Sequence, residues 1–340
     1  MTDNVTSNVT SNVPSVSCIP WIEKYRPNCL SDLILPPDKH NMLKEFFKDN
    51  NFPNLLFYGP PGVGKTSTIL SCAQEYYGTD SKLMMMELNA SDDRGIDVVR
   101  TKIKEFATSL WTLTTDKKCE NEGTTSRKPK LIILDEVDGI SPLAQSALLV
   151  EMENNMANAR FCLICNNVNK LNPAIQSRCL RLRFSPLTRD QIYNKLFEIA
   201  SIEKLNIDDT GLQAIIDLTQ GDMRNALNIL QQMSLTNEVI TQQHVYNSMG
   251  VPLPTEIEML LCYISQHNIR ESFNEIYKYI CDNGLDMNSL VYGIKKVLPL
   301  QNSKKSTEIL SALGKVEVRI ANECSLKIQL GYLLAVLKLH

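Results

Sequence analysis

The chain has 340 residues, of which 43% are hydrophobic and 21% are charged, and its formal net charge at pH 7 is −3. This length allows two or three domains with separate cores, and the composition is ordinary for a soluble globular protein. The charge balance excludes a protein coated in basic side chains, so any contact with nucleic acid must come from a local patch. No apolar run is long enough to span a bilayer, and we therefore expect no membrane partner.

The N-terminal segment, residues 1–17, is polar and repeats the letters Asn-Val-Thr-Ser, which predicts a disordered tail. The ten cysteines of the chain show no disulfide framework, which is typical of a reducing compartment. Cys162 and Cys165 have the spacing of a redox or zinc motif, but they lie in a strand-like apolar run with no second pair nearby. Buried thiols are therefore the better interpretation.

Short apolar runs alternate with helical stretches from about residue 20 to residue 186. This alternation predicts an α/β fold in which helices connect the strands of a parallel sheet. Ser141 and Pro142 have the chemistry of a helix start, and the polar residues 114–130 predict an exposed loop. The candidate strands are residues 55–58, 83–88, 131–134, 161–165 and 181–184.

A phosphate-binding pattern, Gly-Pro-Pro-Gly-Val-Gly-Lys-Thr, follows the first of these strands and precedes a helical run that opens at residues 67–70. Its glycines let successive backbone N–H groups curl around a phosphate, and the helix N-terminus adds partial positive charge. Lys65 is expected to reach the β- and γ-phosphates, and the Thr66 hydroxyl to complete the Mg²⁺ shell. The predicted nucleotide-binding residues of this loop are Gly59, Pro60, Pro61, Gly62, Val63, Gly64, Lys65, Thr66 and Ser67.

The strand at residues 131–134 leads into the acidic run Asp-Glu-Val-Asp. Asp135, at the strand end, can hold Mg²⁺ through water. Glu136 can polarise the attacking water, a task that needs a carboxylate close to the γ-phosphate and not locked onto the metal. Together with the phosphate loop, this pair favours ATP hydrolysis over nucleotide holding alone.

Three further polar residues fit the same chemistry. Asn166 ends the strand at residues 161–165, where its amide could position the water and sense the γ-phosphate. Arg224 lies in the first turn of a helical run whose apolar positions face elsewhere. Taken alone, Asn166 or Arg224 would more often be a cap or a surface charge. Arg178, just before a strand, is either a surface ion-pair residue or an arginine finger that reaches the γ-phosphate of a neighbouring subunit.

After Pro186 the pattern becomes all helical, with apolar residues repeating at helical spacing. We predict an ATPase core over residues 18–186, a small helical lid over residues 187–250 and a second helical block over residues 251–340. The last block carries no chemistry of its own, which indicates a role in assembly.

A set of motifs occurs in order along the chain, at residues 20–27, 59–66, 87–100, 135–138, 161–166, 177–179 and 221–224. Together they resemble the motifs of the small subunits of replication factor C, the AAA+ clamp loader of eukaryotes and archaea. The resemblance runs from about Ile19 to the C-terminus and is most like the subunit called 5 in animals and 3 in budding yeast. It implies a P-loop AAA+ domain with a parallel sheet, a helical lid and an all-helical collar.

The resemblance also implies a function in the nucleus, using ATP and Mg²⁺. The family forms a heteropentamer that opens a sliding clamp of the PCNA type and places it on primer–template DNA during replication and repair. By similarity, Tyr25 and Arg26 would lie near the adenine and phosphates, Asn166 would be sensor 1 and Arg224 sensor 2. Arg178 would then act in trans on the adjacent subunit's site.

Contacts with DNA and with the clamp are expected to be local. Arg94, Arg100 and Lys104 fall at the start of a helix and along it, which suits phosphate contacts, with solvated surface charge as the alternative. The following apolar segment resembles the one with which loaders touch the clamp, although Trp111 could instead cover the sheet. The predicted clamp-contact residues are Leu110, Trp111 and Leu113.

Two features depart from the family pattern. Leu149 and Val150 stand where the family commonly carries two basic residues, and the loop at residues 114–130 is longer than expected.

Two other functions remain open at this point. One is a different AAA+ DNA-processing ATPase, such as a branch-migration motor, and the other is a structural subunit that binds ATP with little turnover.

Overall fold

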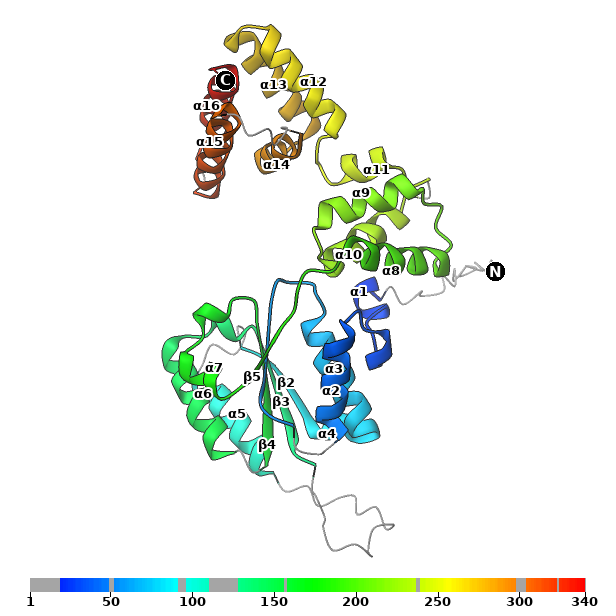
Figure 1. Ribbon diagram of the computed structural model, residues 1–340, viewed down its shortest axis with the longest axis vertical. Coiled ribbons are helices and arrows are strands. Elements are labelled where there is room, and N and C mark those ends of the chain that lie inside the picture. The colour runs from blue at the N-terminus through cyan, green and yellow to red at the C-terminus, as the bar shows by residue number, and fades with distance from the viewer. Residues whose placement is uncertain are drawn as a thin grey trace, which may run out of the picture. The chain divides into compact units, whose positions relative to one another are not determined.

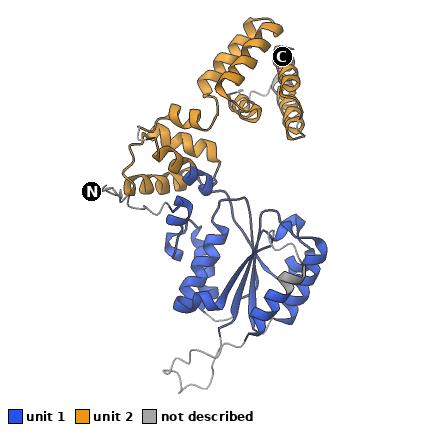
Figure 2. Ribbon diagram, turned by 180° about the vertical axis from the view of Figure 1, so that it is seen from behind, with its two compact units in different colours: residues 1–188, 221–228 blue, residues 189–220, 229–340 orange. Residues whose placement is uncertain are grey.

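The computed structural model describes residues 19–48, 52–90, 96–109, 128–155, 158–236, 239–297, 304–322 and 324–339. The chain divides into two compact units (Figure 2). The first contains the described residues up to 188 together with 221–228, and the second contains 189–220 together with the described residues from 229 onward. The predicted tail at residues 1–17 lies outside the described residues, and the predicted three-domain boundaries stay a prediction.

A five-stranded sheet forms the centre of the first unit, with the strand order β2-β3-β4-β1-β5 and parallel pairing throughout. Parallel pairing places all the carboxyl ends of the strands at one edge of the sheet, where α/β proteins bind their ligands. The predicted α/β core with a parallel sheet is confirmed. The strands are β1 (Leu55–Tyr58), β2 (Met85–Asn89), β3 (Lys130–Asp135), β4 (Ala159–Cys165) and β5 (Leu180–Arg183).

One predicted strand begins in the wrong place. Leu83 and Met84 belong to the short helix α4 (Ser81–Met84), which follows directly on the 3-10 helix η2 (Gly78–Asp80). Leu83 is 56% exposed, so its apolar character reflects no buried strand. The strand starts only at Met85, where pairing with β3 begins.

Helices cover both faces of the sheet (Figure 1). Because the strands are buried on both sides, consecutive apolar residues alternate between two cores. Leu55 and Phe57 pack into one core with α2 and α3, whereas Leu56 packs into the other with α5 and α6. One face carries α2 (Pro37–Lys48), α3 (Lys65–Tyr77) and α4, and the other carries α5 (Ile96–Thr108), α6 (Pro142–Asn154) and α7 (Pro173–Ser177).

Short elements complete the first unit. Helix α6 starts as predicted, because the Ser141 hydroxyl caps it by accepting a hydrogen bond from the backbone N of Ala144 at 3.3 Å. The remaining short elements are α1 (Trp21–Lys24) and the 3-10 helices η1 (Leu30–Asp32), η3 (Val137–Gly139) and η4 (Val168–Lys170).

Asn54 fastens three strands at the amino end of the sheet. Its side-chain Oδ1 accepts a hydrogen bond from the backbone N of Phe161 at 3.0 Å, and its backbone O accepts one from Leu180 at 2.7 Å. Asn54→Ala leaves the fully buried Phe161 N–H without an acceptor, so we expect unfolding to become easier by about 1–3 kcal/mol. Urea denaturation checks this. Asn247→Ala, at an exposed position of α11, should leave the transition in place, and equal behaviour of both variants would contradict the role of Asn54.

The second unit is helical. The predicted apolar faces are confirmed, since Ile192, Leu196 and Ile199 of α8 are buried, as are Leu212 and Ile215 of α9. Residues 223–228 of α10 belong to the first unit and its remainder to the second. The helices are α8 (Arg189–Ile202), α9 (Asp209–Thr219), α10 (Met223–Ser234), α11 (Gln242–Ser248), α12 (Pro254–Gln266), α13 (Ile269–Asn283), α14 (Met287–Val297), α15 (Lys304–Ala321) and α16 (Leu326–Leu339).

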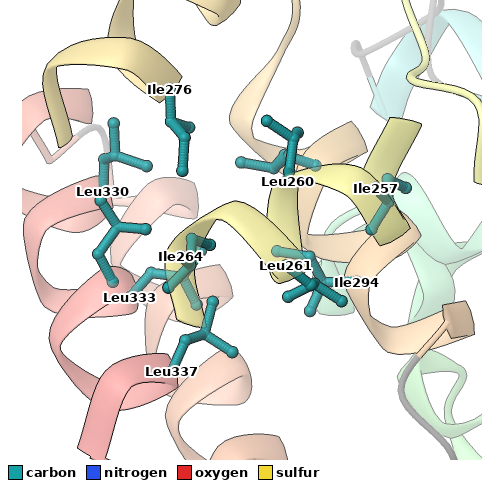
Figure 3. Close-up of a pocket in the computed structure, with 11 residues that line it drawn as sticks. Ile257, Leu260, Leu261, Ile264, Ile276, Ile294, Leu330, Leu333 and Leu337 are labelled. Carbon is teal, nitrogen blue, oxygen red and sulfur yellow. The ribbon is translucent and has the colours of Figure 1, made fainter. Parts of the chain in front are cut away.

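The C-terminal helices meet around a small apolar pocket, into which isoleucine and leucine side chains point from different helices (Figure 3). All of its lining side chains are aliphatic, so it is part of the packed core of this helical block. The labelled lining residues are Ile257, Leu260, Leu261, Ile264, Ile276, Ile294, Leu330, Leu333 and Leu337.

Cys162 and Cys165 are buried in β4, which confirms the interpretation of this pair as buried thiols. Burial raises the pKa of Cys165 to about 12 and also raises the pKa of Cys162, so both stay protonated and poorly nucleophilic. No metal-binding group of histidine, cysteine or carboxylate side chains, and no helix long and apolar enough to cross a bilayer, occurs in the described part of the chain.

Candidate active site

The phosphate loop connects β1 to α3 at the carboxyl edge of the sheet. Gly64 has φ 87° and precedes the first helical residue, Lys65. The helix therefore begins two residues earlier than the sequence predicted, because the backbone N of Thr68 already bonds to the O of Gly64 at 2.9 Å. The strand–loop–helix context that the motif requires is confirmed.

Lys65 lies at the centre of the site and is 7% exposed. Its Nζ donates to the O of Gly59 at 2.8 Å, to the O of Pro60 at 2.7 Å and to Oδ1 of Asn166 at 2.8 Å. These three bonds match the three donors of an ammonium group. Burial lowers the pKa of Lys65, and the positive charge of Arg224 acts in the same direction. The structure thus brings together Lys65 and Asn166, which lie far apart in the sequence.

A second contact joins the loop to β3. Thr66 Oγ1 donates to Oδ2 of Asp135 at 2.7 Å, and Oδ1 of Asp135 accepts from the backbone N of Glu136 at 2.8 Å. Hydroxyl and carboxylate oxygens are the ligand types that Mg²⁺ prefers. The residues present therefore fit a magnesium ion held between Thr66 and Asp135.

Glu136 has an exposed side chain and a left-handed backbone, with φ 54° and ψ 37°. Such a conformation is uncommon for residues other than glycine, and strained backbones of this kind concentrate at functional sites. It turns the chain directly after Asp135, at the end of β3. Glu136 is therefore placed by a fixed turn beside the Thr66–Asp135 pair.

Asp138 is a site residue to which the sequence assigned no role. Its carboxylate accepts from the backbone N of Asn166 at 3.4 Å and from that of Asn167 at 3.1 Å. It thereby ties the end of β4 to the turn after β3. The acidic run that contains it was visible in the sequence, but only the neighbouring position of β3 and β4 shows which backbone groups it holds.

Tyr25 and Arg26 follow the short helix α1. Arg26 pairs with Glu23 at 3.1 Å, and the ring of Tyr25 meets Trp21 edge-on with centroids 6.1 Å apart. The segment is tied to α3 through Ser71, whose hydroxyl donates to the O of Pro27 at 2.8 Å. These contacts place the segment beside the helix of the phosphate loop, and the adenine role stays a prediction.

Arg224 and Arg178 lie in different parts of the first unit. Arg224 is in the first turn of α10, and the backbone N of its neighbour Met223 donates to the O of Gly62 in the phosphate loop at 3.1 Å. Arg178 closes α7, and its Nη2 pairs with Oε1 of Glu153 on α6 at 2.6 Å. Its side chain is 41% exposed, so it is accessible from outside the chain.

Most of the predicted DNA- and clamp-contact residues lie outside the described part of the chain. Lys104 is exposed on α5, and Arg100 belongs to the same helix. Val150 is exposed on α6 and Leu149 is half-buried. The predicted contact residues outside the described part are Arg94, Leu110, Trp111 and Leu113.

The prediction for Lys130 was wrong, because the sequence assigned it to the exposed loop at residues 114–130. It is buried at the start of β3. Its Nζ donates to the O of Phe106 at 2.8 Å and to the O of Ser109 at 2.6 Å. A lysine that satisfies the last carbonyls of a helix can bury its aliphatic stem, and burial lowers its pKa. The rest of this loop lies almost wholly outside the described residues.

Comparison with known families assigns both parts of the chain. Residues 55–187 match the model of the ATPase family associated with various cellular activities (AAA). Residues 252–336 match the model of the replication factor C C-terminal domain.

Three similar curated proteins are subunits of replication factor C. Replication factor C subunit 3 of Schizosaccharomyces pombe is 40% identical over 326 residues, which cover 95% of this chain and 92% of the relative. Replication factor C subunit 5 of Homo sapiens is 39% identical over 320 residues, covering 93% and 91%. Subunit 3 of Saccharomyces cerevisiae is 37% identical over 311 residues, covering 89% and 88%.

Among solved structures, the Thermotoga maritima RuvB Holliday junction branch migration motor matches with a TM-score of 0.50 and 15% identity, over 77% of this chain and 86% of that one. A variant of the same motor matches with a TM-score of 0.51 and 14% identity, over 82% and 93%. Identities this low show a shared fold and nothing more.

Proposed function

The chain belongs to the replication factor C small subunits, which are AAA+ ATPases, and on that ground we propose that it is one ATPase subunit of a heteropentameric clamp loader. Its relatives carry the number 3 in yeasts and 5 in animals, as the sequence motifs predicted. The branch-migration motor is disfavoured, because its likeness to this chain is confined to the fold.

The observation that carries the proposal is the convergence of Lys65, Thr66, Asp135 and Asn166 at one edge of the sheet. The backbone of the phosphate loop, with Lys65, binds the phosphates of ATP. Thr66 and Asp135 would hold Mg²⁺, which would supply positive charge to neutralise the charge that develops on the phosphates. Nucleotide binding follows from the AAA fold, whereas these residue assignments and the metal are our proposal.

Hydrolysis requires residues beyond phosphate binding. Glu136 accepts a proton from the attacking water, and Asn166, held by its bonds to Lys65 and Asp138, positions that water beside the γ-phosphate. Arg224 acts on the phosphates from the start of α10. Arg178 acts on the site of the adjacent subunit, where it stabilises the charge of the transferred phosphoryl group.

We further assign the partners by family membership. The complex opens a sliding clamp of the PCNA type and places it on primer–template DNA in the nucleus. Residues 251–340 form the collar through which the subunits assemble, and residues 187–250 form the lid. Arg94, Arg100 and Lys104 contact DNA phosphates, and the clamp is touched by Leu110, Trp111 and Leu113.

The test is the ATPase activity of the complex purified through this chain, with and without primed DNA and sliding clamp. We expect turnover to rise only when both are present, and Lys65→Ala to remove this chain's share of it. Turnover that is indifferent to clamp and DNA would contradict clamp loading and point to another AAA+ machine.

A further inference from the structure

Gly62 of the phosphate loop lies so close to the start of α10 that only glycine fits at this position. Gly62 has φ 67°, and a Cβ at this position would collide with the carboxylate of Asp222. The backbone N of Met223 also donates to the O of Gly62 at 3.1 Å. The pattern of the phosphate loop does not require glycine at this position, but the positive φ and the proximity of the Asp222 carboxylate both favour it here.

Asp222 is held on its other side as well. Its Oδ1 accepts from the backbone N of Asn225 at 3.1 Å, which caps the first turn of α10. The preceding Gly221 is buried, and its O accepts from the backbone N of Leu187 at 3.3 Å. Asp222 therefore has little freedom to move away from Gly62.

The bond from Met223 fixes the orientation of a peptide group in the loop. In a trans peptide the C=O and the next N–H point in opposite directions, and the described residues contain no cis peptide bond. Since the O of Gly62 is directed at α10, the N–H of Val63 points away from α10. Backbone N–H groups of this loop are the donors that hold phosphate.

We propose that Asp222 is a positioning residue of the nucleotide site. By fixing the start of α10 against Gly62, it sets the direction of the Val63 N–H and the position of Arg224 together. This inference rests on the proposed function, because it assumes that the loop binds ATP. A carboxylate this close to bound phosphates would repel them, and its bond to the positive N-terminus of α10 offsets that repulsion.

The test separates the capping role of Asp222 from its contact with Gly62. Asp222→Asn keeps the size of the side chain and the helix cap but removes the charge. In Asp222→Ser the shorter side chain still caps the helix but no longer contacts Gly62. We expect Asp222→Ser to weaken binding of a fluorescent ATP analogue with Mg²⁺ by the full chain about fivefold, because it loses the contact with Gly62 while it keeps the cap. Asp222→Asn should stay within about twofold of the parent chain, because it preserves the contact.

Two further variants complete the experiment. Ser141→Ala removes the cap of α6 away from the loop, so it should lower the unfolding midpoint without changing affinity. Gly62→Ala should weaken binding about tenfold through strain and collision, and Asp222→Ser added to it should weaken binding no further, since the two sites are in contact.

In the complex, Asp222→Ser should raise KM for ATP while kcat stays within about twofold, because Glu136 and Asp135 are untouched. Unchanged affinity in Asp222→Ser, or strictly multiplicative effects with Gly62→Ala, would overturn the proposal. Lys65→Ala distinguishes this from a failure of the proposed function. If it bound the analogue as tightly as the parent chain, the nucleotide site itself would be wrongly assigned.

Discussion

Replacing Glu136 with glutamine is expected to stop ATP hydrolysis at this chain's site while ATP still binds. A carboxylate that accepts a proton from the attacking water contributes about 10²–10⁴-fold to the rate, and an amide cannot take its place. The bond from Lys65 to the O of Gly59 and the bond between Thr66 and Asp135 do not involve the Glu136 side chain. Binding should therefore remain within about twofold of that of the parent chain.

The measurement combines steady-state turnover of the complex with its nucleotide content after rapid gel filtration and acid quenching. The Glu136→Gln complex should lose this chain's share of turnover and retain unhydrolysed ATP at this chain's site. Glu45→Gln is the matched control, since it changes an exposed glutamate that pairs with Lys48 of its own helix, α2. Unchanged turnover in Glu136→Gln would favour a structural subunit that binds ATP without hydrolysing it.

Replacing Arg178 with alanine should instead disable the neighbouring subunit's site. An arginine that stabilises the charge of the transferred phosphoryl group in trans contributes about 10³–10⁵-fold to the rate. At rest, its guanidinium pairs with Glu153 and donates to the O of Ala174 at 3.2 Å. Both contacts are within the chain and partly exposed, where ion pairs contribute little, so a phosphate can replace them.

Arg178→Ala should leave binding of ATP to the isolated full chain unchanged, because its described contacts are with α6 and α7. Arg181→Ala, an exposed arginine on β5, is the matched control and should leave turnover of the complex unchanged. Combined with Glu136→Gln, Arg178→Ala should remove the turnover of two different sites. If the combined loss equalled that of Glu136→Gln alone, Arg178 would not act in trans.

Local chemistry could be predicted from the sequence, because the phosphate loop and the strand that ends in Asp135 each follow local rules. The pairing of Lys65 with Asn166 could not be derived in the same way. It depends on β4 lying beside β1, and a sequence that alternates strands and helices does not give their order in the sheet. Asn166 itself was predicted from its place at the end of a strand, and the resemblance to a known family added its role as sensor 1.

The residues that were missed share a physical reason. Asp138 accepts from backbone groups after β4, and Lys130 donates to carbonyls at the end of α5. Asp222 caps its own helix and lies against Gly62 of the phosphate loop. Residues of every type carry a backbone carbonyl, and all except proline carry a backbone N–H. The sequence therefore does not show which of these groups bonds to a distant side chain. Gly62 is the exception, because its positive φ and the close approach of Asp222 together favour glycine there.

The two ends of β3 belong to different parts of the structure, and this determines where the chain can change in length. Its last residue, Asp135, belongs to the nucleotide site, and its first, Lys130, lies five strand steps away, roughly 17 Å. Lys130 fastens the end of α5, and Lys128 donates to the O of Tyr76 at 2.8 Å, so both ends of the intervening segment are anchored. A change of chain length between residues 113 and 128, beyond the proposed clamp-contact residues, should therefore leave hydrolysis undisturbed, and an affinity tag inserted there should be equally harmless.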